Sequence, residues 1–295
     1  MNRVSPQVLA LLAALTLMWG TNWPLFRIAL DELPVLTFRS IVLIAGTAVL
    51  ILVVKLRGET FAVPRGKWPV LIAAAAFNMF IWNIATSMAV LYIPSGHASV
   101  LAYTMPLWVA LLGFVVFGQR LTSRLLLAIV VGAAAVVALM VPNFRSYANA
   151  PAGLFWGLSA GLSWAIGTFV VKRTVWPKMG VSLTFWQAAL SLPPTVLGAL
   201  LIDGLPQHWP SAPVLIAAVY TGAVPMALGT ASWFALVRLL PTQVAALSSI
   251  AIPIVAIVSG VVFLHEPLSP LQAVAIGSTV LSLWLALMPP RAAKR

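Results

Sequence analysis

Apolar runs long enough to cross a lipid bilayer fill most of this sequence. A transmembrane helix needs about 20 consecutive apolar residues, and about ten such runs fit into the chain. Because backbone polar groups in lipid must be bonded internally, and because the runs are continuous rather than alternating, we expect helices and not a β-barrel. The runs extend from Val8 to Leu30, Val35 to Val54, Trp68 to Leu91, Ala98 to Phe117, Leu121 to Val141, Ala152 to Val175, Val181 to Ile202, Pro213 to Val237, Thr242 to Leu264 and Leu268 to Met288.

Composition supports an all-α integral membrane protein with ten transmembrane helices. Of the 295 residues, 62% are hydrophobic and only 7% are charged, whereas soluble domains carry about 25% charged residues. The first apolar run is longer than the core of a signal peptide, so we interpret it as a retained span. The chain contains no cysteine, which excludes disulfides, thiolate metal sites and cysteine nucleophiles.

The basic residues indicate how the chain is oriented in the membrane. Although a net charge of +12 would suggest nucleic acid in a soluble protein, the basic residues lie between apolar runs, so we expect no nucleic-acid partner. With a cytoplasmic N-terminus, all of the 17 Lys and Arg residues except Arg27, Arg39 and Arg145 lie at cytoplasmic ends. Cytoplasmic connections are enriched in such residues. We therefore predict a multi-pass protein of a bacterial-type inner membrane, surrounded by lipid, with both termini cytoplasmic.

The chain resembles itself when it is shifted by 147 residues. This single offset aligns Gly20-Thr21 with Gly167-Thr168. It also superimposes two prolines of the first half on two of the second, Pro94 on Pro241 and Pro106 on Pro253. We infer two five-helix repeats, residues 1–147 and 148–295. Five is an odd number, so the repeats enter the membrane in opposite senses, as in transporters that expose a central site to each side in turn. A duplicated scaffold or receptor without transport is the alternative.

The sequence offers no set of residues for enzyme chemistry. We find no nucleophile paired with a base, no metal-ligand cluster and no glycine-rich phosphate loop. The three histidines, His97, His208 and His265, lie near predicted span ends without ligand spacing. We therefore expect a protein that is not an enzyme, with no metal site and no cofactor.

Polar and aromatic residues inside the spans are candidates for the wall of a substrate cavity. An amide in hydrocarbon is costly unless it faces water, substrate or a partner, and Trp or Tyr at mid-span lies outside the interfacial belts. For the serines, bonding to a helix backbone is the more usual role. The candidate residues are Trp19, Asn22, Asn78, Trp82, Tyr103, Ser163, Trp164, Gln187, Ser248 and Ser249. The equivalent prolines Pro106 and Pro253 are candidate hinges, because a proline inside a helix weakens it locally.

The acidic residues constrain the substrate. All five, Asp31, Glu32, Glu59, Asp203 and Glu266, lie in connections or at span ends. An intramembrane carboxylate is the usual proton or cation site of a transporter, and none is predicted at mid-depth. A neutral or zwitterionic substrate therefore fits better than a dication, with its carboxylate held by helix N-termini or by backbone amides freed at broken helices.

Several motifs resemble those of a known family. They are Trp19-Gly20-Thr21-Asn22, Phe38-Arg39, the stretch from Met105-Pro106-Leu107-Trp108 through Phe117-Gly118-Gln119-Arg120-Leu121-Thr122, and His265-Glu266-Pro267-Leu268-Ser269. In this order and spacing they resemble the drug/metabolite transporter superfamily, in its ten-helix EamA-type branch, and most of all the YddG-type aromatic amino-acid exporters. One departure is Gln119, where the family usually has a glutamate.

The resemblance implies a secondary transporter that exports amino acids, aromatic and other neutral ones, or related small metabolites by alternating access between two inverted halves. A multidrug exporter of aromatic cations is the alternative within transport, since Trp and Tyr also bind cations. A non-transporting scaffold or receptor is the third possibility. The expected partner is thus a small-molecule substrate, and the oligomeric state stays open.

Overall fold

The fold is all-helical in the part of the chain that the structure, a computed structural model, describes. The described residues are 6–118, 123, 126, 127, 130, 131, 134, 150–176, 179–205, 208–233, 242–266, 270, 273, 274, 277, 278 and 281. The fifth and tenth predicted spans, Leu121–Val141 and Leu268–Met288, therefore lie mostly outside the described residues.

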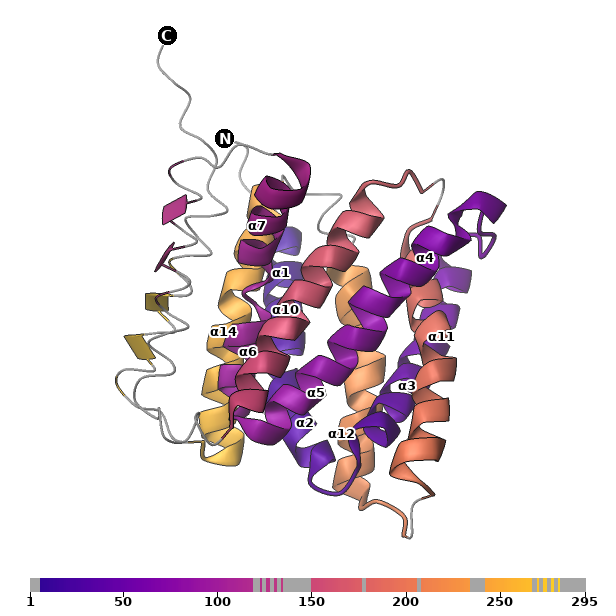
Figure 1. Cartoon of the computed structure of the whole chain (residues 1–295). Helices are drawn as coiled ribbons and strands as arrows, with labels where there is room; N and C mark the ends of the chain where they lie inside the picture. Colours follow the sequence, from indigo (N-terminus) through magenta and orange to yellow (C-terminus); the bar gives the residue numbers. More distant parts are fainter. Residues whose placement is uncertain are drawn as a thin grey trace.

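The helices stand side by side as a bundle (Figure 1). Those of the first half are α1 (Pro6–Gly20), α2 (Asn22–Leu30), α3 (Val35–Leu56), η1 (Arg65–Lys67), α4 (Trp68–Ala75), η2 (Ala76–Ile81), α5 (Trp82–Tyr92), α6 (Ser95–Ala102) and α7 (Met105–Phe117). Those of the second half are α10 (Pro151–Lys172), α11 (Val181–Gly198), η3 (Ala199–Asp203), α12 (Ala212–Thr221), η4 (Gly222–Gly229) and α14 (Thr242–Leu264).

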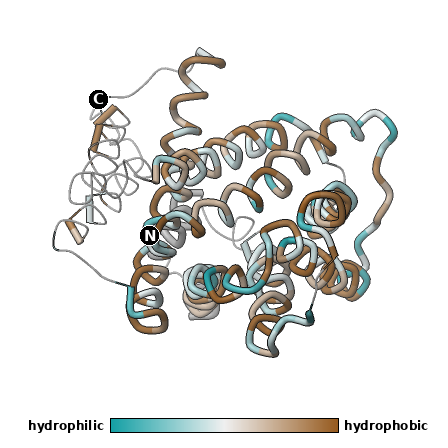
Figure 2. Tube along the Cα trace, turned by 60° about the horizontal axis from the view of Figure 1, so that its bottom comes forward, coloured by the Kyte–Doolittle hydropathy of each residue, from teal (hydrophilic) through white to brown (hydrophobic). Residues whose placement is uncertain are grey.

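The bundle has the dimensions and surface of a membrane protein. Among the described residues, 6 helical segments are long and apolar enough to cross a bilayer. They are Val35–Leu56, Arg65–Tyr92, Ser95–Val116, Pro151–Lys172, Val181–Asp203 and Ala212–Trp233. Large apolar side chains such as Ile44, Leu52 and Leu201 are exposed on the outside of the bundle, and hydrophobic residues occur along the helices in Figure 2. Such a surface suits lipid rather than water.

Two predicted spans are interrupted rather than continuous. The first consists of α1 and α2, separated at Thr21, and the fourth consists of α6 and α7, separated at Tyr103 and Thr104. Pro106 therefore does not lie inside a continuous helix as expected, but in the first turn of α7. A proline is well tolerated there, because the first N–H groups of a helix have no intrahelical partner. Pro253 does lie inside α14, and it is buried.

The third and eighth spans change helical type at matching positions. Each has a π-helical segment near its middle, η2 after α4 and η4 after α12. Residue 76, where η2 begins, corresponds to residue 223 under the 147-residue offset, one residue inside η4. A π turn leaves the helix wider and its hydrogen bonds irregular, and such turns are frequent at functional sites.

The two halves meet through long helix pairs. In the described part of the chain, α3 packs most extensively against α11, and α5 against α10. Close approach also depends on small residues. A Cβ added to Gly222 on η4 would lie 2.2 Å from the carbonyl oxygen of Val42 and 3.0 Å from the backbone nitrogen of Gly46, both on α3. This contact requires glycine, as is usual where helices pack closely in membranes.

Carboxylates of each half bind helix N-termini of the other half. Asp203, at the end of η3, accepts a hydrogen bond from the backbone N–H of Thr37 in the first turn of α3. Glu59, which follows α3, accepts from the backbone of Gly180 and Ser182 at the start of α11, both at 3.1 Å. Backbone N–H groups at a helix start attract negative charge. The pair α3 and α11 is thus capped reciprocally.

Two further carboxylates bind helix starts in the same way. Glu266, after α14, accepts from the backbone of Ser95 at 2.8 Å and of Gly96 at 3.4 Å, at the start of α6. Glu32, after α2, accepts from Ser211, the residue before α12. The expectation that helix N-termini hold the substrate's carboxylate therefore does not apply to α3, α6, α11 or α12, whose N-termini are already bound.

Candidate functional site

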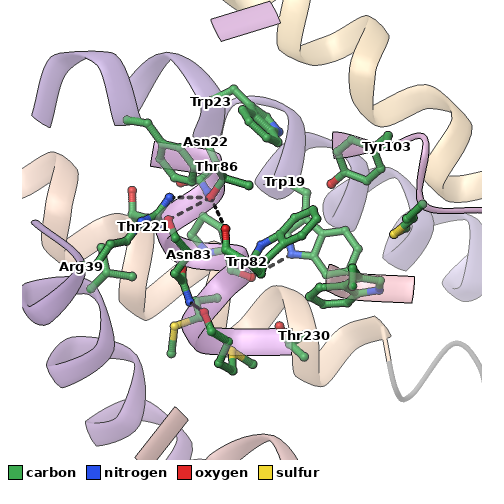
Figure 3. Close-up of a pocket in the computed structure, with 17 residues that line it drawn as sticks. Trp19, Asn22, Trp23, Arg39, Trp82, Asn83, Thr86, Tyr103, Thr221 and Thr230 are labelled. Atoms are coloured by element: carbon green, nitrogen blue, oxygen red, sulfur yellow. Dashed lines mark hydrogen bonds between the residues drawn. The ribbon is translucent and has the colours of Figure 1, made fainter. Parts of the chain in front are cut away.

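A cavity lies between the two halves at the centre of the bundle. Its wall is formed by α1, α2, α3, η2, α5 and the α6–α7 break from the first half, and by α10, α12 and η4 from the second. Figure 3 shows the labelled side chains converging on it from these elements. The lining residues are Trp19, Asn22, Trp23, Phe26, Arg39, Val42, Met79, Trp82, Asn83, Thr86, Tyr103, Met105, Trp164, Thr221, Pro225, Met226 and Thr230.

Aromatic rings form much of the wall. Trp82 on α5 and Trp164 on α10 pair across the halves with ring centroids 4.8 Å apart and a tilt of 59°. Trp23 meets Tyr103 edge to face, with centroids 6.3 Å apart. Such rings offer flat apolar surfaces to a substrate, while few polar groups fix its orientation.

Trp19 is fixed at the junction of the two halves. Its indole N–H donates a hydrogen bond to the carbonyl oxygen of Pro225, at 2.8 Å, inside η4. A Cβ on Gly229 would lie 2.5 Å from the same indole nitrogen, so the ring fits only because residue 229 has no side chain. The π segment of the second half thus supplies both the acceptor and the space for Trp19.

Arg39 is the cationic residue of the cavity wall. It lies in the second turn of α3 and only 1% of it is exposed. Its Nε donates to the Ser87 hydroxyl at 2.6 Å and its Nη2 to the Thr86 hydroxyl at 2.9 Å. The guanidinium also lies over the ring of Phe26, 4.1 Å from its centroid. A cation over an aromatic face is favourable.

Thr86 is oriented to accept from this arginine. Its own hydroxyl proton is directed to the carbonyl oxygen of Trp82 one turn earlier in the helix, at 2.8 Å. The oxygen lone pairs are thereby left for the Arg39 guanidinium. The cavity therefore contains a cation held by neutral hydroxyls, and none of the five acidic residues lines it.

Half of the predicted site residues lie in this cavity. They are Trp19, Asn22, Trp82, Tyr103 and Trp164. Their positions support the argument that mid-span aromatic and amide residues face an interior space. The side chains of Ser248 and Ser249 lie outside the described residues, although α14 itself is described.

Three predicted site residues pack between helices instead of lining the cavity. Asn78 donates its amide to the Gln187 side-chain oxygen at 2.9 Å, which joins η2 to α11. Asn78 also packs against Gly167 on α10, where any Cβ would collide with its amide. Ser163 donates to the carbonyl oxygen of Phe77 at 2.5 Å. The Asn78 amide nitrogen and the Ser163 hydroxyl thus bond across the halves, while the Asn78 side-chain oxygen is buried without a hydrogen-bond partner among the described residues.

Sequence reasoning missed Arg39 as a site residue. It was counted among the three basic residues on or beside outside connections, and it is buried in α3. The available signal was its position inside the predicted span Val35–Val54, because an ionisable residue within a transmembrane segment is a functional candidate by default. Thr221 and Thr230 were missed as well, since isolated threonines in apolar runs carry no signal of their own.

The described residues contain no group of three or more His, Asp or Glu side chains that could hold a metal ion. Their polar chemistry at the centre is limited to one guanidinium, amides, hydroxyls and indoles. This set can bind and orient a small molecule.

Comparisons with known proteins identify the family and the fold of this chain. The model of the EamA-like transporter family matches the chain twice, over residues 6–141 and 151–288. A solved structure, described only as "Crystal structure of protein", superimposes with a TM-score of 0.65 at 21% sequence identity, covering 95% of this chain and 97% of that one. At that identity the likeness shows the fold alone.

Relatives of similar length include proteins named as a transporter, an efflux pump and an exporter. The chain is 28% identical over 268 residues to the "Uncharacterized transporter YvbV" of Bacillus subtilis, covering 88% of this chain and 84% of the relative. It is 26% identical to a "Probable amino-acid metabolite efflux pump" of Salmonella typhimurium, covering 86% of each. It is also 26% identical to a "Probable terminal-alkyne amino-acid exporter" of Streptantibioticus cattleyicolor, covering 87% of this chain and 85% of the relative.

Proposed function

The chain belongs to the EamA-like transporter family, and from that premise we propose that it is a secondary exporter of amino acids or closely related small metabolites. Membership makes it a multi-pass membrane transporter rather than an enzyme. The substrate class is the proposed part. It is suggested by relatives whose names specify amino-acid metabolites and a terminal-alkyne amino acid.

The observation that carries the proposal is the central cavity with walls from both halves. Trp82 and Trp164 contact each other in its wall, while Asn22 and Arg39 provide polar groups. Sites for small molecules are typically concave, mostly apolar and equipped with a few polar groups that set orientation. An amino acid matches this pattern, because it joins a charged end to a side chain of variable apolarity.

The cavity argues against the alternative of an aromatic-cation exporter. Aromatic rings alone would suit a cation. However, the buried positive charge of Arg39 lies in the same wall, and none of the five acidic residues lines it to balance a second cation. Like charges in a low-dielectric site repel strongly. A zwitterion or anion is therefore the better substrate.

We assign export to alternating access between residues 1–147 and 148–295. The double match of the family model and the matching π segments η2 and η4 support two related halves. In inverted repeats, rocking of one half against the other exposes a midplane site to each side in turn. The Trp19–Pro225 hydrogen bond and the Trp82–Trp164 contact cross this boundary. They must therefore loosen or slide during transport.

Flux into proteoliposomes tests the proposed function. Purified protein should transport one or more labelled amino acids from a panel of aromatic, aliphatic and small polar members, down their gradients. Trp82→Ala and Trp164→Ala should lower that flux about tenfold or more, because aromatic contacts dominate such sites. Trp209→Ala is the matched control, since Trp209 is 90% exposed. Absence of flux for the entire panel, with flux of ethidium instead, would overturn the proposal in favour of cation export.

A further inference from the structure

We propose that Arg39 binds the carboxylate of the transported molecule, so that this protein selects amino acids and related carboxylates over the corresponding amines and amides. The inference rests on the proposed transport function and adds the chemical group that is recognised. It also replaces helix N-termini with a side chain as the carboxylate's partner.

The first argument is that Arg39 has an unbalanced buried charge. Among the described residues, the ion pairs join Arg27 to Asp31 and Arg57 to Glu59, and no carboxylate reaches Arg39. A charge removed from water is costly unless a counter-charge or a full set of hydrogen bonds compensates for it. Two neutral hydroxyls and an aromatic face compensate only in part. An anionic ligand in the cavity would supply the rest.

The second argument is that part of the guanidinium is free to bind. A guanidinium has five N–H donors, and the described contacts use one on Nε and one on Nη2. The described hydrogen bonds of Arg39 do not involve Nη1, and Arg39 lines the cavity. The remaining donors form the planar fork that binds a carboxylate through two parallel hydrogen bonds.

The third argument is that the guanidinium is held in one orientation. Thr86 and Ser87 hold one edge of it, and the rings of Phe26 and Phe38 lie 4.1 and 4.8 Å from its central carbon. A side chain fixed in this way loses little further freedom when a ligand binds. Pre-organisation of this kind raises affinity and fixes the ligand's orientation.

A complementary group for the substrate's ammonium lines the same cavity. Asn22 lines the cavity, and its buried side-chain oxygen has no hydrogen-bond partner among the described residues. An amide oxygen accepts hydrogen bonds, and a buried acceptor without a partner is costly. An α-ammonium group would satisfy it. Arg39 and Asn22 together thus offer a donor set and an acceptor for the two charged ends of an amino acid.

A purely structural role makes a different prediction. If Arg39 only braces α3 against α5 through Ser87 and Thr86, its replacement destabilises the fold but leaves the choice among substrates unchanged. If it binds the carboxylate, the wild-type protein itself must discriminate between an acid and its neutral amide. The decisive comparison therefore starts with the unmodified protein.

The experiment measures competition for transport into proteoliposomes. The labelled substrate is the amino acid of the panel that is transported fastest. With L-phenylalanine as that substrate, the competitors are L-phenylalanine, L-phenylalaninamide and phenethylamine. We expect both carboxylate-free analogues to compete about tenfold less well or worse, which is the scale of a lost charge-assisted pair. Equal competition by all three would overturn the carboxylate assignment while leaving the transport function in place. Absence of flux for every amino acid would instead remove the transport function.

Variants complete the test. Arg39→Gln should abolish the preference for the acid over the amide in whatever flux remains, and Arg39→Lys should retain part of it. Arg65→Gln is the matched control, because Arg65 is an exposed arginine outside the cavity. If Arg39→Gln does not yield folded protein, the Arg39→Lys variant and the competition measured with the wild type still test whether Arg39 binds the carboxylate. An unchanged acid preference in a folded Arg39→Gln variant would contradict the proposal.

Discussion

Asp203 accepts two hydrogen bonds from Thr37, one from its backbone N–H at 2.7 Å and one from its hydroxyl at 2.9 Å. This contact fixes the first turn of α3 to the last turn of the seventh span. Arg39 follows Thr37 by two residues, so the same contact helps to position the guanidinium over the cavity. The reciprocal contact of Glu59 with Gly180 and Ser182 fixes the opposite ends of α3 and α11.

Asp203→Ala should reduce the free energy of unfolding by about 1 kcal/mol, the usual value of a side chain that caps a helix start. The variant leaves the N–H of Thr37 without its acceptor. Thermal unfolding in detergent measures the change. Asp31→Ala is the control, because Asp31 pairs with Arg27 at an exposed site, where ion pairs contribute little. Equal midpoints for the Asp203 variant and the wild type would show that water replaces the cap at no cost.

The contact of Glu32 with Ser211 should make stability depend on pH. The Ser211 hydroxyl and backbone N–H donate to Glu32 at 2.6 and 2.7 Å, and these bonds lower the pKa of Glu32 from its ordinary 4.5. A lowered folded pKa means that the stabilisation is complete above the unfolded value and is lost as the pH falls through the folded one. Unfolding midpoints of the wild type and Glu32→Gln should therefore differ at pH 7 and converge as the pH falls below the ordinary 4.5 and through the lowered folded pKa. A constant difference across this range would rule out the carboxylate as the source.

Gly222→Ala should severely reduce the yield of folded protein. Its Cβ would approach the Val42 carbonyl oxygen to 2.2 Å, and backbone cannot move aside as a flexible side chain can. Overpacking typically costs about 1–3 kcal/mol, and more where the obstacle is rigid. Size-exclusion profiles and unfolding midpoints measure the effect. Gly66→Ala is the control, since nothing lies within 4 Å of a Cβ at that position. Similar yields for both variants would indicate that α3 and η4 can separate without penalty.

The sequence was most informative about the features that a lipid environment imposes, namely helical spans and the positions of charged residues. Continuous apolar runs predicted helices, and six described segments have the required length and apolarity. It was also correct that the acidic residues lie at helix ends, because a charge in hydrocarbon is expensive. The interruptions at Thr21 and at Tyr103 were not predicted. They lie within the predicted apolar runs Val8–Leu30 and Ala98–Phe117, whose overall hydropathy does not show where the helix breaks.

The site was only partly predictable, because partner choice depends on packing between the halves. Trp82 and Asn78 recur on one stripe of the third span, yet only Trp82 lines the cavity. Asn78 instead donates a hydrogen bond to Gln187, a residue 109 positions away in the sequence. No local pattern identifies that partner. Arg39 lies close to a span end in sequence, but α2 and α5 enclose it in space. Its burial is a tertiary property.

The orientation of the chain remains a prediction that the structure helps to test. The absence of cysteine allows single cysteines to be labelled selectively at exposed positions. Trp209 and Val175 are 90% and 81% exposed. With cytoplasmic termini, Trp209→Cys should react with a membrane-impermeant maleimide added outside cells, and Val175→Cys should react only after the membrane is opened. The reverse pattern would invert the predicted topology.

The equivalent prolines should affect the speed of transport more than substrate affinity. Pro253 lies inside α14, where a proline removes a hydrogen bond to the carbonyl one turn earlier. Pro106 is the second residue of α7, just after the break at Tyr103 and Thr104, where its missing N–H prevents α6 from continuing. Both features weaken a helix that must bend or shift if the two halves rock against each other.

Pro253→Ala should restore the missing hydrogen bond, and Pro106→Ala should let α6 extend toward α7. Each change stiffens its span, so we expect the maximal flux in proteoliposomes to fall several-fold while the half-saturating concentration changes little, as is typical when a conformational step is slowed. Pro151→Ala is the matched control, because Pro151 is exposed at the first position of α10, where proline and alanine are both well tolerated. Wild-type flux in both Pro106→Ala and Pro253→Ala would mean that these prolines are static features and that the halves move about other points. The pairing of Trp19 with Pro225 would then be the next contact to alter, because it also joins the two halves across the cavity.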